Sequence, residues 1–558
     1  MRRRAKLPLS EPRTVADLLA ARVGDDHVAI VFEGRPWSWA DVMVEAQRRA
    51  AMLTAARVDG PFHVGVLLDN VPEYVFMLAA AGICGATIVG VNPTRRGEHL
   101  AGDIRHTDCQ LLVTDHEHRS LLDGVDFGVA PDGIIEIDDP NYERRLPPAT
   151  ETAPALAAAP APDDLYVLLF TSGSAGAPKA VRMTHARATR ASDSPMCTRA
   201  DIPYCAMPLF HGNALIACVL PAFRFGNTVA LKRKFSASEF IDDVRANGCT
   251  YFSAIGRVLN YILATPPRSD DRDNKLKLVL GPESSPADMR AFQERFGCPV
   301  FAGYGSSENA IVLLPAPRTA EGAMGVSTEG DDVVVIHPET GDVCPTAIFD
   351  EGGALLNGNE AIGELVGRNT LDRFEGYYNN PEAEQERRRN GWYWSGDLAY
   401  RDADGVFWFA GRTADWIRVD GENFATAPVE RVLARFDNAS SVAAYGVPDE
   451  RNAEDQVMAA LELVDGAAFD ASAFSDFLAN EPDLGTKWVP RFVRIVDRMP
   501  VTGTDKIDKK PLRADAWNTD DNVWWRPNRR GNEYRRLDAT ERDALNQALA
   551  ANRKGIAR

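Results

Sequence analysis

The segment from Leu165 to Thr184 reads LYVLLFTSGSAGAPKAVRMT and decides the fold prediction. Its apolar start, Leu165 to Phe170, predicts a buried strand, and Ala180 to Thr184 predicts a second short strand. Between them lie glycines, hydroxyl side chains and one cation, Lys179. Such a loop offers unblocked backbone N–H groups, hydroxyls and a positive charge in a small volume, which are the groups that bind a triphosphate. The segment therefore suggests a nucleotide-phosphate loop.

An ordinary turn would use the same residue types, because Gly, Ser and Pro are the common turn formers. The loop is not a P-loop of the Walker A type, since that motif places Gly directly before its lysine and Ser or Thr directly after it. Here Pro178 precedes Lys179 and Ala180 follows it. The segment alone leaves a turn and a phosphate site open, and it disfavours a P-loop NTPase.

The composition indicates a large globular protein. The chain has 558 residues, of which 45% are hydrophobic and 25% charged, enough for more than one domain. The formal net charge of −18 argues against nucleic acid as a main partner. Its 8 cysteines contain no CxxC pair, so the sequence predicts neither a zinc site nor a disulfide framework, and a reducing cytoplasm is expected.

No membrane-spanning segment is predicted. The basic N-terminus MRRRAKLPLSEP is not followed by an apolar core, so a secretory signal is not expected. An uncharged run extends from Tyr74 to Asn92 and is interrupted by Gly82, Gly85 and Gly90. This run predicts a buried helix followed by a buried strand.

The order of the predicted elements indicates an α/β protein. Helical and strand patterns alternate from Thr14 to about Pro147, which predicts parallel strands, and a Pro- and Ala-rich connector follows to Pro162. Further strands and helices alternate up to Ala302, and short β segments begin near Gly363. The predicted segments include helices in 50–56, 73–81 and 236–246 and strands in 63–68, 86–91, 250–253, 277–280, 300–302, 441–447, 456–463 and 492–496.

Several single residues follow these elements. His211 ends YCAMPLFHGN and is expected to be a packed or pocket-wall residue. Glu308 ends YGSSE behind a strand, where it could hold Mg²⁺ on phosphate oxygens, although a solvated surface acid is the alternative. Asp397, read as an exposed-turn acid, and Arg412 bracket a predicted hairpin turn at 402–405; they could hold a ribose or form a surface ion pair. Lys506 lies on a Gly and Thr turn or, alternatively, in a solvated basic tail.

The blocks together resemble the adenylate-forming enzymes, which include acyl-CoA synthetases, luciferases and peptide-synthetase adenylation domains. The resemblance covers nearly the whole chain and rests on FTSGSAGAPKAV, PLFHGN, YGSSE, GELVGR, YWSGDLAYRDADGVFWFAGR, DWIRVDGENFA and TGTDKIDKKPLR. The long GRTADWIRVDGENFA stretch and TGTDKI look most similar to the fatty-acid transport protein and very-long-chain acyl-CoA synthetase subgroup. The resemblance implies a large, multi-subdomain N-terminal α/β domain, residues 1–411, and a small mobile α+β C-terminal domain, residues 412–558.

The resemblance also implies the chemistry and the cofactors. A carboxylate attacks the α-phosphorus of ATP to give an acyl-adenylate and pyrophosphate, and the CoA thiol then attacks the activated carbonyl and releases AMP. ATP, Mg²⁺ and CoA are the implied ligands. Matching the motifs residue by residue implies three groups of site residues. The ATP group is Thr171, Ser172, Gly173, Ser174, Ala175, Gly176, Lys179, Gly281, Tyr304, Gly305, Ser306, Ser307, Asp397 and Arg412.

The second group would bind the metal and catalyse the reaction. The third group would bind the acyl and CoA substrates. Glu308 and Thr171 would hold the metal, and Lys506 would bridge the carboxylate and the α-phosphate. His211 and Gly305 would line the acyl pocket. Arg418, Gly421 and Glu422 would serve the thioester step, after the small domain has moved.

Four positions depart from the family pattern. Ala180 stands where Gly is usual, and Ser307, which keeps a hydroxyl, stands where Thr is usual. Ala414 occupies the hinge position, where a small residue is compatible with a large backbone change. Asp505 replaces a Gly directly before Lys506, so a carboxylate lies next to the catalytic ammonium in the sequence.

The expected function is an ATP-dependent acyl-CoA synthetase for a long-chain, very-long-chain or bulky hydrophobic carboxylic acid. The alternatives are a ligase for steroid side-chain acids, a fatty acyl-AMP ligase that transfers the acyl group to a carrier protein, and a non-catalytic lipid uptake or binding protein. A cytoplasmic location is expected, and the sequence leaves open a homodimer and a peripheral contact with the inner membrane face. Such a contact would involve the aromatic and basic tail around Trp524 and Trp525, for which packing against the small domain is the other prediction.

Overall fold

A computed structural model describes most of the chain. The described residues are 11–148, 159–170, 179–194, 197–254, 258–281, 286–315, 319, 322–338, 340–350, 355–412, 416–419, 422–450, 455–481, 484–485, 487–502, 505–529 and 531–556. Backbone contacts divide the chain into two compact units: unit 1 is residues 1–310 and 372–386, and unit 2 is residues 311–371 and 387–558. These units do not divide at residues 411 and 412, where the domain boundary was predicted. That domain boundary stays a prediction.

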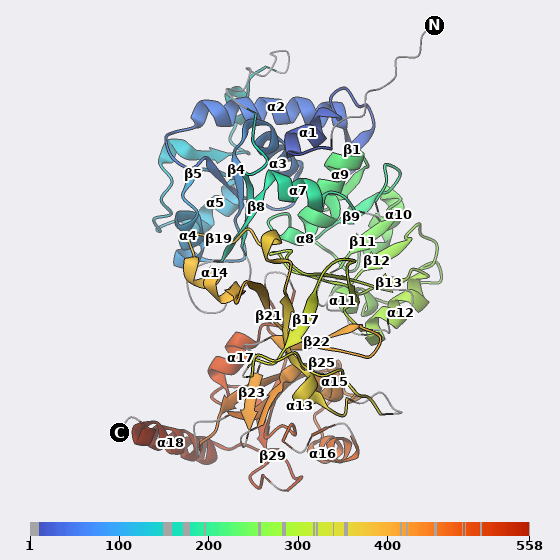
Figure 1. Cartoon of the computed structure of the whole chain (residues 1–558), viewed down its shortest axis with the longest axis vertical. Coiled ribbons are helices and arrows are strands. Elements are labelled where there is room, and N and C mark those ends of the chain that lie inside the picture. The colour runs from blue at the N-terminus through green and yellow to red at the C-terminus, as the bar shows by residue number, and fades with distance from the viewer. Residues whose placement is uncertain are drawn as a thin grey trace. The chain divides into compact units, whose positions relative to one another are not determined.

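Unit 1 contains two seven-stranded, largely parallel sheets (Figure 1). The first has the order β19 (Tyr377–Tyr378), β8 (Ala180–Thr184), β7 (Leu165–Phe170), β4 (Thr87–Gly90), β3 (His63–Leu67), β5 (Cys109–Thr114) and β6 (Ile134–Glu136). The second has the order β13 (Val300–Phe301), β12 (Leu278–Leu280), β11 (Tyr251–Ser253), β9 (Pro203–Cys205), β10 (Val229–Leu231), β1 (Val28–Phe32) and β2 (Arg35–Ser38). The parallel pairing predicted from the alternation of helices and strands is therefore confirmed.

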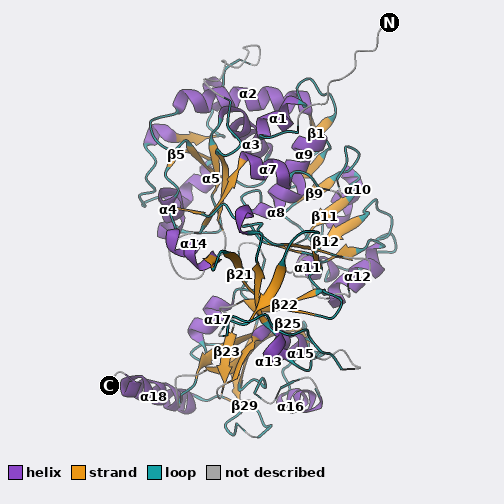
Figure 2. Cartoon of the chain, in the orientation of Figure 1, coloured by secondary structure: helices purple, strands orange, loops and turns teal. Residues whose placement is uncertain are grey.

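Helices lie between and around the strands of unit 1 (Figure 2). They are α1 (Val15–Ala20), α2 (Trp39–Ala56), α3 (Pro72–Cys84), α4 (Gly97–His106), α5 (His116–Arg119), α6 (Tyr142–Arg145), α7 (His185–Ala191), α8 (Gly212–Ala214), α9 (Leu220–Phe225), α10 (Phe240–Asn247), α11 (Val258–Leu263), α12 (Pro286–Phe296) and, running up to the boundary with unit 2, α14 (Pro381–Arg387). One hydrophobic core contains side chains from both sheets and from α2 and α3. The predicted helices are present, and α2 begins earlier than the predicted helix, at Trp39, where Ser38 supplies a capping box.

The uncharged run that begins at Tyr74 forms a buried helix and a buried strand, as predicted. Every side chain of α3 from Pro72 to Gly82 is buried, and so is all of β4. Within the described part of the chain, no helix is both long and apolar enough to cross a membrane. The run is apolar because it is enclosed by protein on all sides.

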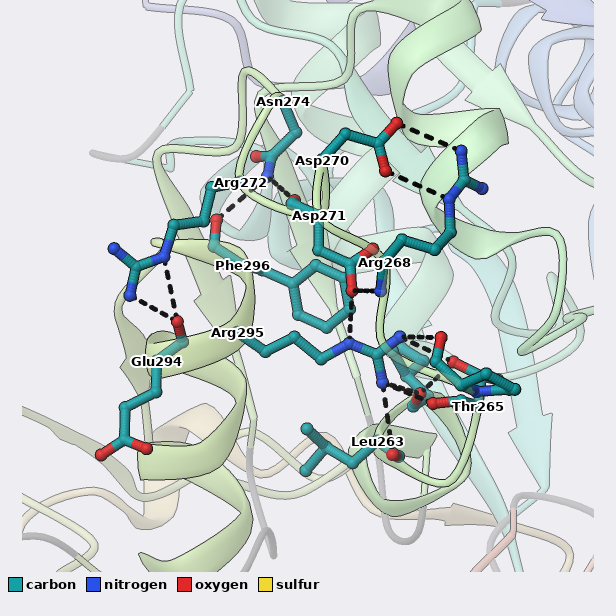
Figure 3. A network of polar contacts seen from close by, with 12 residues as sticks. Leu263, Thr265, Arg268, Asp270, Asp271, Arg272, Asn274, Glu294, Arg295 and Phe296 are labelled. Carbon is teal, nitrogen blue, oxygen red and sulfur yellow. Dashed lines mark hydrogen bonds and ion pairs between the residues drawn. The ribbon is translucent and has the colours of Figure 1, made fainter.

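Arg295 of α12 holds the end of α11 in place (Figure 3). Its guanidinium donates to the carbonyl oxygens of Ile262, Leu263 and Thr265 at 3.2, 3.2 and 2.8 Å, and it pairs with Asp271 at 2.7 Å. The last carbonyls of a helix have no partner inside the helix, so an arginine fork that reaches several of them acts as a cap. This contact fixes α11 against α12.

Unit 2 consists mainly of two five-stranded sheets. One sheet runs β17 (Val333–Ile336), β18 (Gly363–Gly367), β21 (Trp392–Arg401) and β20 (Arg388–Arg389), with β22 (Phe407–Arg412) also paired to β21. The other runs β25 (Ala439–Pro448), β26 (Asp455–Leu463), β27 (Phe492–Val496), β28 (Asn522–Trp525) and β29 (Arg535–Arg536). The remaining elements are the pairs β15 (Val312–Leu314) with β16 (Val326–Ser327) and β23 (Trp416–Val419) with β24 (Glu422–Ala425), and the helices α13 (Gly358–Ala361), α15 (Thr426–Leu433), α16 (Ala471–Asn480), α17 (Lys509–Asp515) and α18 (Ala539–Ile556).

The aromatic and basic tail packs within unit 2, which confirms that prediction. Trp525 lies in a buried cluster with residues of β26, β27 and α18, and Trp524 packs against a second cluster. The Arg526 guanidinium is buried and donates to the carbonyl oxygens of Val489, Pro490 and Gly531. These side chains complete the sheet of the unit.

Candidate active site

The two strands that frame the predicted phosphate loop are present. β7 and β8 are antiparallel neighbours with Phe170 opposite Ala180. The loop residues Thr171, Ser172, Gly173, Ser174, Ala175 and Gly176 lie outside the described residues, so their role stays a prediction. Ala180, where the family usually has Gly, is a fully buried strand residue that pairs with Phe170 and with Tyr378.

Lys179 lies where the chain leaves this loop, and its side chain is directed into unit 1. The side chain is 12% exposed, and its Nζ lies 3.1 Å from Glu386 Oε2. The same Nζ lies 5.9 Å from the centroid of the Tyr377 ring. The cation is therefore held between a carboxylate and an aromatic face.

Tyr377 connects this cation to Glu308. Strand β19 pairs with β8, with Tyr377 opposite Val181, and the buried Tyr377 hydroxyl donates to Glu308 Oε1 at 2.7 Å. Glu308 is 7% exposed, so the alternative of a solvated surface acid is wrong. Lys179 and Glu308 thus both lie next to Tyr377, Lys179 at its ring and Glu308 at its hydroxyl.

Tyr377 is not among the residues predicted from the sequence. The signal was available in GYYNNPE at 376–382, where two aromatic residues follow a Gly and precede an Asn-Pro turn. The pattern did not reveal that Tyr377 binds Glu308. β19 joins a sheet whose other strands end more than a hundred residues earlier in the chain, so the pairing could not be read from neighbouring residues.

A buried arginine binds the backbone of the YGSSE segment. Tyr304 and Gly305 form the short strand β14 (Tyr304–Gly305), and the backbone turns at Asn309, whose φ is 53°. Arg187, 1% exposed, donates to the carbonyl oxygens of Ser307 and Arg182. The segment is therefore held by its backbone, which leaves the side chains of Ser306 and Ser307 half-buried beside Glu308.

The two predicted glycines near this segment differ in their surroundings. Gly281 is buried at the end of β12 and donates its N–H to the Phe301 carbonyl at 2.9 Å. Gly305 is exposed, and a Cβ placed on it would meet no atom within 4 Å. Gly281 is thus part of the sheet, whereas open space borders Gly305.

Glu308 fits a Mg²⁺ ion that is shared with a triphosphate. Oε1 is occupied by the Tyr377 hydroxyl, and no hydrogen bond to Oε2 is found within the described ranges. Those ranges also hold no group of three or more His, Cys, Asp or Glu side chains arranged for a metal. Mg²⁺ is usually held by one or two carboxylates together with phosphate oxygens and water, so one available carboxylate oxygen is a suitable protein contribution.

His211 lies next to this region, on the neighbouring loop. It is half-buried and directly precedes α8, and its place in the acyl pocket stays a prediction. A Cβ placed on Gly212 would lie 3.6 Å from Ser307 Oγ. On the other side of the loop, a Cβ on Gly90 would lie 2.7 Å from the Phe210 carbonyl oxygen, so only Gly permits this approach of β4.

In unit 2, the prediction that Asp397 is an exposed-turn acid is wrong. Asp397 lies inside β21, half-buried, opposite Arg412 on β22, and the turn of this hairpin is made by Asp402 and Gly405. The Asp397 N–H donates to Ser395 Oγ at 3.1 Å. The backbone register thus places the predicted ribose pair on adjacent strands; the side chain of Arg412 lies outside the described residues.

Lys506 lies in a tight turn, as predicted. The Thr502 N–H donates to the Lys506 carbonyl at 2.7 Å, and Val501 and Ile507 form a β bridge. Asp505 has a φ of 57°, in the left-handed region that Gly adopts readily and Asp tolerates. Asp505 therefore holds a backbone conformation that a Gly at this position would also adopt.

The residues predicted for the thioester step lie around another hairpin of unit 2. Strands β23 and β24 pair with Arg418 opposite Asn423 and Val419 opposite Glu422. Gly421 and Ala414 lie outside the described residues, as do the side chains of Arg418 and Glu422. Their roles stay predictions.

Comparisons with known proteins agree with this architecture. Residues 19–378 match the model of the AMP-binding enzyme family. The chain is 44% identical to steroid-22-oyl-CoA synthetase of Rhodococcus jostii, over 96% of this chain and 97% of that protein. It is 43% identical to the medium/long-chain-fatty-acid–CoA ligase FadD17 of Mycobacterium marinum, over 92% of this chain and 99% of that protein.

A solved structure gives the same fold. ATP-bound MatB from Rhodopseudomonas palustris superposes with a TM-score of 0.76 at 21% identity, covering 90% of this chain and 98% of that one. Because the family match spans residues 19–378 and the relatives align along almost the whole chain, the chain belongs to the AMP-binding enzyme family.

Proposed function

We propose that the protein is an ATP- and Mg²⁺-dependent ligase that joins a bulky hydrophobic carboxylic acid to CoA through an acyl-adenylate. The observation that supports the chemistry best is the buried Glu308 carboxylate, fixed through Oε1 by the Tyr377 hydroxyl, with Lys179 beside the ring of the same tyrosine. A metal ligand and a cation so close to a Gly- and Ser-rich loop match the needs of a triphosphate.

In the first half-reaction, one carboxylate oxygen of the acid forms a bond to the α-phosphorus and the bond to pyrophosphate breaks. Glu308 would hold Mg²⁺, which neutralises phosphate charge, through Oε2. Lys179 would stabilise the departing pyrophosphate as its negative charge grows. Lys506 would offset the charge on the reacting carboxylate and α-phosphate.

In the second half-reaction, the CoA thiol loses its proton, its sulfur attacks the acyl carbonyl, and AMP leaves. The segment from Arg418 to Gly421 would border the pantetheine arm, where a Gly leaves room for it. Asp397 and Arg412 would keep hold of the ribose hydroxyls through both steps.

The proposed substrate class follows the named relatives. A steroid side-chain acid is the first candidate, because the relative with 44% identity is a steroid-22-oyl-CoA synthetase. Medium- and long-chain fatty acids are the second, because FadD17 has 43% identity. The open space next to Gly305 supports a bulky acid over a small one.

The test is a panel of acids assayed for AMP and acyl-CoA formation with ATP and Mg²⁺, with and without CoA. The panel contains steroid side-chain acids, fatty acids of increasing length and a small aromatic acid. Equal amounts of AMP and acyl-CoA, formed only when CoA is present, would support the proposal.

Two outcomes would overturn it. Pyrophosphate release without CoA consumption, followed by acyl transfer to a carrier protein, would identify an acyl-AMP ligase. Binding of the acid without ATP consumption would identify a non-catalytic lipid-binding protein.

A further inference from the structure

One face of the helix that follows His211 is not fully packed. His211, Asn213, Ile216 and Ala217 are half-buried, whereas their neighbours Gly212, Ala214, Leu215 and Cys218 are buried. Asn213, Ile216 and Ala217 stand at positions i, i+3 and i+4, so they share one face of the helix, and His211 directly precedes that helix. The start of this helix lies next to YGSSE, because a Cβ placed on Gly212 would lie 3.6 Å from Ser307 Oγ.

The helix is widened at this face. Residues Leu215–Val219 form a π-helical turn, in which the Leu220 N–H donates to the Leu215 carbonyl. Pro221 has no N–H to donate to the Ala217 carbonyl, and the Tyr251 hydroxyl of β11 donates to that oxygen instead, at 2.5 Å. The sheet thus holds the irregular turn in place, and π turns of this kind are frequent at functional sites.

Asn213 carries a polar atom without a protein partner. Its Nδ2 donates to Ser253 Oγ at 2.9 Å, and its Oδ1 is buried with no hydrogen-bond partner in the described part of the chain. Ser253, 3% exposed, lies at the end of β11 and fixes the amide. Buried amide oxygens are nearly always paired, because leaving one unpaired costs most of its hydration free energy.

The missing partner is best supplied by a substrate hydroxyl. A hydroxyl both donates and accepts, so it satisfies the free atom of Asn213 in either orientation of the amide. The position restricts where the hydroxyl sits on the substrate, since the adjacent Gly212 lies beside the segment that carries Glu308. The donor must therefore be close to the carboxylate end of the acid.

We propose that Asn213 is a specificity-determining residue that hydrogen-bonds a hydroxyl near the carboxylate end of a bulky acid. This inference rests on the proposed function, because it assumes that the acid lies along the face of Asn213, Ile216 and Ala217. On a steroid acid, the matching hydroxyl would be on the ring next to the acid side chain and not on the ring farthest from it.

The experiment compares three steroid acids with the same side chain: one without a hydroxyl, one with a hydroxyl on the near ring and one with a hydroxyl on the far ring. kcat/KM for acyl-CoA formation is measured for the wild type and for Asn213→Leu, which keeps the volume and removes the polar atoms. We expect the wild type to prefer the near-ring hydroxyl, and Asn213→Leu to reduce that preference roughly 10- to 100-fold. The acid without a hydroxyl should change far less.

Ile216→Leu is the control on the same face. It changes the shape of the face without a polar group, so it should alter kcat/KM for all three acids by a similar factor. Circular dichroism and the melting temperature establish that both variants fold.

The outcomes separate the two proposals. No acyl-CoA from any acid would refute the proposed function itself. If the wild type forms acyl-CoA but shows no preference for the near-ring hydroxyl, the proposed role of Asn213 is wrong, whatever the variants show. An equal loss for all three acids in Asn213→Leu would overturn it as well.

Discussion

The Glu308 region of unit 1 and the Lys506 turn of unit 2 are built in different ways. Glu308 is fixed by Tyr377, 69 positions away, and its segment by Arg187, which is 120 positions from Ser307. The Lys506 turn is shaped by backbone hydrogen bonds between Thr502, Asp505 and Lys506 themselves. The position of the Glu308 carboxylate thus depends on the tertiary fold, whereas the turn that carries Lys506 depends on local backbone geometry.

The largest effect is expected at the local site. Lys506→Ala should slow adenylation roughly 10²- to 10³-fold, because it removes a cation that acts on charge developing in the transition state. The thioester step, started from supplied acyl-adenylate and CoA, should change little. Pyrophosphate release and acyl-CoA formation measure the two steps separately.

Lys510→Ala is the matched control, since Lys510 is an exposed lysine on α17. Equal slowing of both steps in Lys506→Ala, or unchanged adenylation, would remove Lys506 from the proposed mechanism.

The next effect concerns the tertiary contact at Glu308. Tyr377→Phe removes the hydroxyl that holds Oε1, and a hydrogen bond to a charged group contributes about 1.5–3 kcal/mol, so adenylation should fall roughly 10-fold or more. The Mg²⁺ concentration that gives half-maximal adenylation should rise. Tyr378→Phe, which removes the neighbouring hydroxyl bound to Asp108, is the control. A Mg²⁺ dependence identical to that of the wild type would contradict the role of Tyr377.

The next effect concerns the ionic contacts of His118 in unit 1, which should make stability depend on pH. His118 donates to Asp115 at 2.7 Å and to Asp69, and these hydrogen bonds raise the pKa of His118 to about 9. Lys234 lies 3.2 Å from the other carboxylate oxygen of Asp69. The folded-state pKa is above the unfolded value of about 6.5, so this stabilisation is complete below about pH 6.5 and is lost as the pH rises through 9.

The size of that contribution is about 1–2 kcal/mol once solvent screening is taken into account. His118→Gln should therefore lower the melting temperature at pH 6 more than at pH 9.5. Differential scanning calorimetry at both pH values measures this difference, and an equal decrease at the two values would show that the charge of His118 does not stabilise the fold.

The smallest effect concerns the backbone of the Lys506 turn. Asp505→Gly keeps the left-handed conformation at φ 57°, so adenylation should stay within about threefold of the wild type. Asp505→Val disfavours that conformation by roughly 1–2 kcal/mol and should slow adenylation more, with little change in melting temperature. If Gly and Val gave the same rate, backbone conformation at this position would not matter for Lys506.

Elements specified by neighbouring residues could be predicted from the sequence, whereas contacts between distant segments could not. Strands β7 and β8, the buried helix α3, the hairpin turn at Asp402 and the turn at Lys506 were all predicted, because each is specified by residues within one or two turns of chain. Asp397 was misplaced, since an acid directly after Ser395 and Gly396 looks the same in a strand and in a turn. The side-chain partners of Glu308, Asn213 and His118 were not predicted.

The sequence by itself determined the element types, the order of the motifs and the family to which they belong. It also determined which ionisable side chains stand at the predicted site positions, whereas their pKa values depend on the surroundings that the fold gives them. Only the tertiary structure decided that Tyr377 holds Glu308, that Arg187 supports Ser307, and that Ser253 leaves one atom of Asn213 unpaired. The physical reason is that these contacts join segments 40 to 120 positions apart, and their geometry depends on how the sheets bring those segments together.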